Sequence, residues 1–184
     1  MGEEKKLTLT SEVLEELKGY IQEHYEIAPQ YSDIGDVYMS IPDGLDFEEE
    51  IHKDTVFFEQ KEVRSLEDVI EEIGESFHDQ LFRYIDMSGM TDVEVYKRAN
   101  IDRKLFSKIR SNPAYHPRKN TILALAIALQ LSLDEMTDLL CRAEYALSPS
   151  SKTDLIVKFF IEKGIYDIFV INEALDQYGE PILG

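Results

Sequence analysis

The stretch 89–135 constrains the fold of this 184-residue chain more than any other segment. It contains three segments whose apolar residues recur at helical spacing, and short turns with recognisable capping residues separate them. Most of the chain's concentrated positive charge lies in the first half of this stretch. The pattern predicts a compact group of short helices, one of which has a basic outer face.

The first of these helices has a marked start and a marked end. Gly89 is suited to the left-handed end of a preceding helix. Thr91 and Glu94 have the spacing of a capping box, which predicts a helix over 92–99. Asn100 tolerates a positive φ, so a tight turn is expected directly after that helix.

The next helix supplies the basic face. Asp102 is its expected N-cap, and Phe106 and Ile109 are spaced to point inward. The side chains expected to point outward are Arg103, Lys104, Ser107 and Lys108. After a loop with two prolines, residues 118–131 are apolar almost all round and predict a buried central helix.

The remaining boundaries complete an all-α prediction. Ser132 and Glu135 form another capping box, which opens a helix extending to Leu147. Ser65 is the expected cap of a helix that continues to Ser88, and apolar Ile182 and Leu183 indicate a packed tail. The expected parts are an N-terminal helix (1–25), an acidic linker or loosely structured segment (26–64), a five-helix domain (65–147) and a C-terminal extension with a helical hairpin (148–184).

Three groups of residues within 89–136 carry a family resemblance. They are Gly89, Met90, Thr91, Glu94 and Val95; Pro117, Thr121, Ile122, Leu125, Ala126, Ala128 and Leu129; and Ser132, Leu133 and Glu135. In this spacing they resemble the helix-turn-helix domain of the phage-repressor and Cro type. The chain departs from that pattern at Tyr96, where the family prefers Ala, at Ala99, where it prefers a large apolar residue, and at Asn100, which replaces the turn Gly.

This resemblance implies a DNA-binding transcriptional regulator whose third helix contacts DNA, and it implies a homodimer that reads two half-sites. A second similarity is weaker. Residues 11–25, 91–111 and 164–175 resemble helical tails that follow macro domains in some bacterial proteins. No macro-domain sequence is present, so ADP-ribose chemistry is not assigned, and the chain is treated as the possible tail of a larger protein.

The charge distribution agrees with a local DNA site on an acidic chain. The net charge is −18, whereas residues 96–119 carry eight basic side chains and one acidic one, a local charge of +7 that leaves −25 elsewhere. A duplex would therefore meet a favourable field only at this patch. The predicted DNA-binding residues are Lys97, Arg103, Lys104, Ser107, Lys108, Arg110, Arg118 and Lys119.

Other interpretations of the basic residues stay open. They can form a solvated face or pair with acidic residues of the same chain, and the acidic stretch 43–62 is a candidate for covering them. Alternatively, the domain is a helical protein-interaction module that binds an acidic protein surface without DNA. Tyr115, in the adjacent loop, is a candidate ligand contact, and Leu105 is either a thymine-methyl contact or core.

An enzyme is not expected. The four histidines lack metal-ligand spacing, no glycine-rich phosphate loop occurs, and neither a catalytic residue, a metal nor a cofactor is predicted. Cys141 is the single cysteine, so an intramolecular disulfide is impossible, and it is expected to be a packed core thiol. With no signal peptide or long apolar run, the expected location is the cytoplasm, away from membranes.

Overall fold

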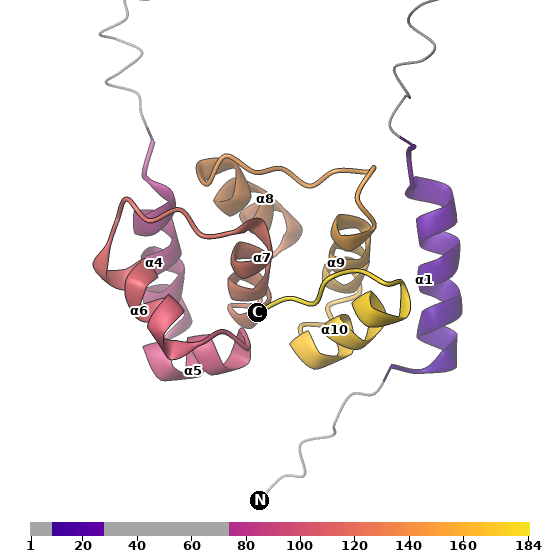
Figure 1. Cartoon of the computed structure of the whole chain (residues 1–184), viewed down its shortest axis with the longest axis horizontal. Coiled ribbons are helices and arrows are strands. Elements are labelled where there is room, and N and C mark those ends of the chain that lie inside the picture. The colour runs from indigo at the N-terminus through magenta and orange to yellow at the C-terminus, as the bar shows by residue number, and fades with distance from the viewer. Residues whose placement is uncertain (1–8, 28–73) are drawn as a thin grey trace, which may run out of the picture. The chain divides into compact units, whose positions relative to one another are not determined.

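A computed structural model describes residues 9–27 and 74–184, and this part of the chain contains eight helices and no strand (Figure 1). The all-α prediction is confirmed there. The helices are α1 (Ser11–His24), α4 (Phe77–Ser88), α5 (Asp92–Arg98), α6 (Arg103–Ser111), α7 (Lys119–Ala128), α8 (Leu133–Arg142), α9 (Lys152–Glu162) and α10 (Ile168–Gln177). They belong to one compact unit.

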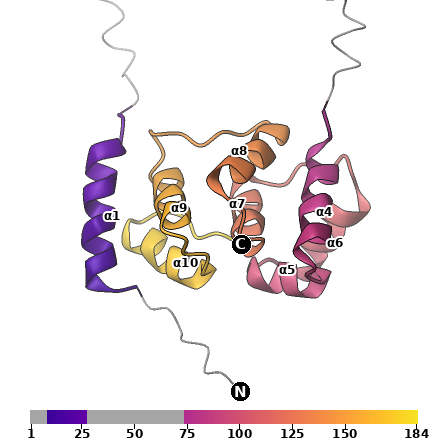
Figure 2. The ribbon, with the colours of Figure 1, turned by 180° about the vertical axis from the view of Figure 1, so that it is seen from behind.

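Helix α7 is the centre of this unit. Every residue from Thr121 to Leu129 is buried, which confirms the predicted central helix. Helices α5, α8 and α10 pack directly against it, and Figures 1 and 2 show α7 between the group α4–α6 and the pair α9–α10 from both sides. A helix that is apolar all round needs neighbours on every side, and these helices provide them.

Local capping signals were accurate around this centre. The capping boxes Thr91–Glu94 and Ser132–Glu135 both form at the starts of α5 and α8. The Thr91 N–H donates to the Glu94 carboxylate and holds the pKa of that carboxyl below its usual range. Gly89 ends α4 with φ 67°, and Asn100 has φ 53° in the turn after α5.

Two predicted helix boundaries are wrong. Residues 74–76 are not helical, and α4 begins at Phe77 with Ser76 as its N-cap, so the expected helix does not run unbroken from Ser65. Continuing a helix through Gly74 would cost about 1 kcal/mol, whereas the Ser76 hydroxyl accepts a bond from the Asp79 N–H. Ser65 itself, like most of the predicted linker 26–64, lies outside the described residues.

The second boundary error concerns α8, which ends at Arg142 and does not reach Leu147. Glu144 takes a left-handed φ of 59°, and its N–H bonds to the carbonyl of Cys141. The following N–H, of Tyr145, bonds to the carbonyl of Leu140. These two bonds satisfy the last carbonyls of the helix and stop it.

Helix α1 is an integral part of the compact unit, although a long stretch of sequence separates it from the other helices. Its Leu17 and Ile21 are buried, and it packs against α9. Lys163 pairs with Glu16 at 2.5 Å, and the Glu26 N–H donates to the carbonyl of Pro149. Helices α9 and α10 also pack on each other, which gives the predicted C-terminal helical hairpin.

The left-handed residue after α5 provides a test of this fold. Replacing Asn100 with Val should lower the free energy of unfolding by about 1–2 kcal/mol, because a β-branched side chain clashes with the backbone at positive φ. Asn100→Gly is the matched control and should be neutral or slightly stabilising. Urea unfolding followed by circular dichroism measures both, and equal stability of the two variants would contradict the turn.

Candidate nucleic-acid interface

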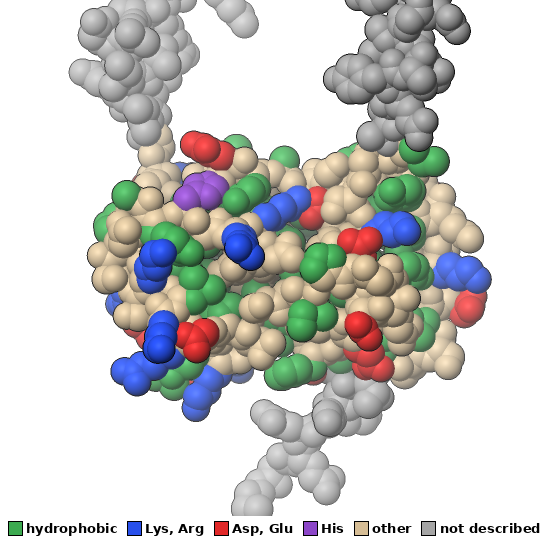
Figure 3. Space-filling model, in the orientation of Figure 1, with side chains coloured by type: hydrophobic (Ala, Val, Ile, Leu, Met, Phe, Trp, Pro, Cys, Tyr) green, Lys and Arg blue, Asp and Glu red, His purple; other side chains and the backbone are tan. Residues whose placement is uncertain are grey.

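Helix α6 lies on the core by one face and carries basic side chains on the other. Phe106 and Ile109 are buried, as the spacing predicted. The predicted outward residues Arg103, Lys104, Ser107 and Lys108 are all exposed. Figure 3 shows Lys and Arg side chains gathered over the end of the molecule that holds α5 and α6.

The turn between α5 and α6 fixes where this face begins. The Asp102 carboxylate accepts a bond of 2.6 Å from the Lys104 N–H, which confirms the predicted N-cap. Lys97 and Arg98 lie in the last turn of α5, directly before this connection, and both are exposed. The end of α5 therefore adds two cations beside the start of α6.

Arg110 is also exposed, but unlike the other α6 cations it forms an ion pair within the protein. Its Nε lies 3.1 Å from the Asp92 carboxylate at the start of α5, and its guanidinium lies over the ring of Phe82 on α4. The ring nitrogen Nε2 of His78 also bonds to the Arg110 carbonyl at 3.1 Å. Arg110 thus holds α4, α5 and α6 together, and Asp92 offsets its charge.

Lys119 is also engaged within the fold. Its Nζ lies 2.5 Å from Oδ2 of Asp154, a carboxylate on α9 that is only 3% exposed. The same oxygen accepts a bond of 2.9 Å from the Ser148 N–H. Because the partner is 35 residues away, no local pattern in the sequence could have revealed this pair.

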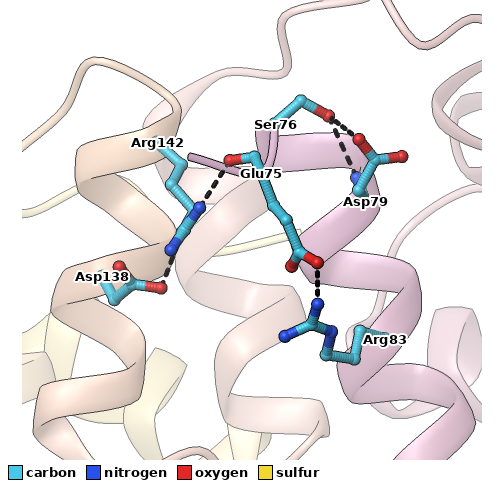
Figure 4. A network of polar contacts seen from close by, with 6 residues as sticks. All are labelled: Glu75, Ser76, Asp79, Arg83, Asp138 and Arg142. Carbon is cyan, nitrogen blue, oxygen red and sulfur yellow. Dashed lines mark hydrogen bonds and ion pairs between the residues drawn. The ribbon is translucent and has the colours of Figure 1, made fainter. Parts of the chain in front are cut away.

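Two further arginines, on α4 and α8, form the network in Figure 4. Arg83 pairs with Glu75, and Arg142 binds Asp138 at 2.8 Å and the carbonyl of Glu75 at 2.5 Å. The bond to Asp138 is the main cause of a raised pKa of Arg142. This network joins the start of α4 to α8, and its carboxylates offset the charge of both arginines.

Among the described residues, the cations that form ion pairs and those that do not lie mostly in different parts of the structure. Eight of them form no ion pair with another described residue, and six of these eight lie within 96–119. The six are Lys97, Arg98, Arg103, Lys104, Lys108 and Arg118, which we call the basic face. Of the cations predicted for the site, Arg110 and Lys119 fall outside it because each has a carboxylate partner.

The loop between α6 and α7 borders this basic face. The Lys108 ammonium lies 4.1 Å from the centre of the Tyr115 ring, which is half-buried against the core. His116 bonds through Nε2 to the carbonyl of Ala143 at 2.7 Å and thereby holds the loop to the end of α8. Arg118 is the N-cap of α7, and its side chain makes no capping bond.

A hollow of about 350 Å³ lies between α5 and α6. Val93 and Tyr96 of α5 and Phe106 of α6 give it apolar walls, and Arg103 and Ser107 lie at its polar side. Val93 is 47% exposed, so part of the apolar wall is open to solvent. No pattern in the sequence indicated this hollow, because it depends on how α5 and α6 cross.

The surroundings of Cys141 and Leu105 show whether each belongs to the core. Cys141 is exposed, so the expectation of a packed core thiol is wrong. The buried residues of α8 are Met136, Leu139 and Leu140, and Cys141 falls on the opposite side of the helix. Leu105 is half-buried and packs against the core, which leaves part of its side chain accessible next to the basic face.

Comparisons with protein-family models, curated proteins and solved structures found no match to this chain. Among residues 9–27 and 74–184, no three His, Cys, Asp or Glu side chains are grouped in a way that could hold a metal ion. None of the helices described is long and apolar enough to span a bilayer. The acidic stretch 43–62 lies outside the described residues, so its expected contact with the basic face stays a prediction.

The buried position of Asp154 predicts a structural role for Lys119. Replacing Lys119 with Met should lower the free energy of unfolding by about 2 kcal/mol, because Asp154 would keep a buried charge without its cation. The matched control is Lys158→Met, which removes a more exposed pair with Glu162 and should cost less than about 0.5 kcal/mol. Equal effects in urea unfolding would show that the Lys119 pair is not structural.

Proposed function

We propose that this chain is a helix-turn-helix protein that binds duplex DNA and regulates transcription. Helices α5 and α6 are the two helices of the motif, and α6 lies in the major groove. The observation that carries the proposal is the outer face of α6. It presents Arg103, Lys104, Ser107 and Lys108 to solvent, while Phe106 and Ile109 anchor the helix to the core.

The distribution of paired cations supports the same assignment. An ion pair within the protein already offsets a cation's charge, whereas an unpaired cation can neutralise a phosphate and release its counterion. The basic face holds six cations that have no ion-pair partner among the described residues. In the rest of the described chain only Lys18 and Lys152 are in that position.

Roles within the basic face follow from position. Arg103 and Lys104 begin α6 and are best placed for base edges, where an arginine can bind guanine through two bonds. Lys97 at the end of α5 and Arg118 at the start of α7 flank α6 and suit phosphate contacts. The uncapped start of α7 adds backbone N–H groups that favour an anion.

The hollow between α5 and α6 favours a second candidate, an acidic protein surface. Val93, Tyr96 and Phe106 offer apolar walls that a phosphate backbone does not use, whereas an apolar side chain of a protein partner would fill them. In this alternative the basic face steers the acidic partner to the hollow. A Val93→Gln variant should weaken such a complex and leave binding to duplex DNA unchanged.

Charge reversal on α6 tests the DNA assignment. The full chain should bind a labelled random-sequence duplex at about 50 mM salt and lose most of its affinity by about 200 mM, because counterion release drives binding. Reversal at Arg103→Glu, Lys104→Glu and Lys108→Glu together should abolish binding. Each residue replaced singly by Ala should lower the salt slope by about 1 if it contacts a phosphate. Fluorescence anisotropy measures all of these.

The control keeps the net charge of the reversed variant but moves the change elsewhere. Lys18→Glu, Lys152→Glu and Lys158→Glu lie on α1 and α9, outside the basic face, and should retain most of the affinity. Equal loss in both triple variants would mean that net charge, not α6, governs binding. Absence of salt-sensitive binding to duplex, single-stranded DNA and RNA would rule out the proposed function and favour the acidic protein partner.

A further inference from the structure

The last residues of the chain are held in place by α10. We call residues 180–184 the tail; it turns back after α10, and Figure 1 shows it crossing toward α7. The Asn172 side chain binds both backbone polar groups of Leu183: its Oδ1 accepts from the Leu183 N–H at 2.8 Å, and its Nδ2 donates to the Leu183 carbonyl at 3.0 Å. Asn172 and Leu183 are both buried, while the neighbouring Ile182 is exposed.

The end of the tail meets the backbone of the turn between α5 and α6. Gly184 lies so close to this turn that an added Cβ would stand 2.4 Å from the Asn100 carbonyl oxygen and 3.0 Å from that of Ala99. Gly184 also has φ 102°, a conformation that side chains disfavour. A larger residue at 184 therefore requires the tail or the turn to move.

This turn determines where α6 starts. The Asn100 and Ile101 N–H groups bond to the carbonyls of Lys97 and Tyr96, at 3.2 and 3.0 Å. Asp102, the N-cap of α6, follows directly. A displacement of the carbonyl of Asn100 is thus passed to Asp102, the N-cap of α6, across one residue, the buried Ile101.

We propose that Asn172 is a positioning residue, which holds the tail against the turn between α5 and α6 and so fixes the start of α6. Arg103 and Lys104 stand at that start, so their placement depends on a side chain of α10. The consequence for DNA binding rests on the proposed function, whereas the contact between tail and turn does not.

Simple covering of the core does not account for these contacts. Burying the Leu183 side chain would need neither two bonds to its backbone nor a glycine that approaches a carbonyl oxygen. A buried side chain that binds both polar groups of one residue fixes the backbone there in position and direction. The direction given to Leu183 is the one that carries Gly184 to the turn.

Hydrogen exchange followed by NMR separates positioning from general stability. The probe is the Ile101 amide, and the reference is the Leu131 amide, which makes the same type of bond, to Ala126, in the turn after α7. In Asn172→Asp and in Gly184→Ala, exchange at Ile101 should become about tenfold faster, and exchange at Leu131 should change less than about twofold. The exposed neighbour Glu173→Gln is the control and should change neither amide.

Two outcomes overturn the proposal. Equal acceleration at both amides would mean that Asn172 contributes only to overall stability, and unchanged exchange at Ile101 in both variants would mean that the tail does not hold the turn. Duplex affinity forms a separate arm, in which Gly184→Ala, which leaves the net charge unchanged, should weaken binding about threefold or more while Glu173→Gln does not weaken it. If the unmodified chain fails to bind duplex, the proposed function fails, and the exchange result still decides the role of the tail.

Discussion

Burial of α7 on every side is the constraint on which the rest of the described structure depends. Ile122, Leu123 and Leu125 have no accessible surface at all, so neighbouring helices must surround this helix. Helices α5 and α8, on either side of it in sequence, cover part of its surface, and α10 covers another part. The outer helix α6 can then be short and strongly polar on one side, because it needs to bury only Phe106 and Ile109.

Polar contacts of Lys119 and Arg142 join particular helices to one another in addition to this apolar packing. Lys119 and Asp154 join the start of α7 to α9, and Arg142 joins α8 to the residues before α4. Without these partners, the charges of Lys119 and Arg142 would add to the positive surface. The pairing of these cations concentrates the remaining positive charge around α6, although the chain as a whole is strongly acidic.

The sequence predicted the local features well, because each depends on a few neighbouring residues. The capping boxes at Thr91 and Ser132 and the turn at Asn100 are examples, since the bonds involved span no more than five residues. Non-local contacts were not predictable in this way. The partner of Lys119 lies 35 residues away, and the hollow beside Val93 depends on the crossing of two helices.

The error at Cys141 has the same origin. Free cysteines are usually buried, which predicted a core position for Cys141, but the side of a helix that is buried is set by the helices packed on it. The sequence predicted that both Ile182 and Leu183 pack. Only Leu183 is buried, because Asn172 holds the backbone in one orientation. The candidate site was predicted from charge, and only the fold showed which of its cations form ion pairs with other described residues.

The packing of α1 on α9 has a consequence for synthesis of the chain. Glu16 and its partner Lys163 are 147 residues apart, so α1 leaves the ribosome long before α9 exists. At about 5–20 residues per second, that delay is on the order of 7–30 seconds. During this time α9, the helix on which α1 packs, is not yet present. The acidic residues Glu12, Glu15 and Glu16 on the exposed side of the helix would then discourage self-association of nascent chains.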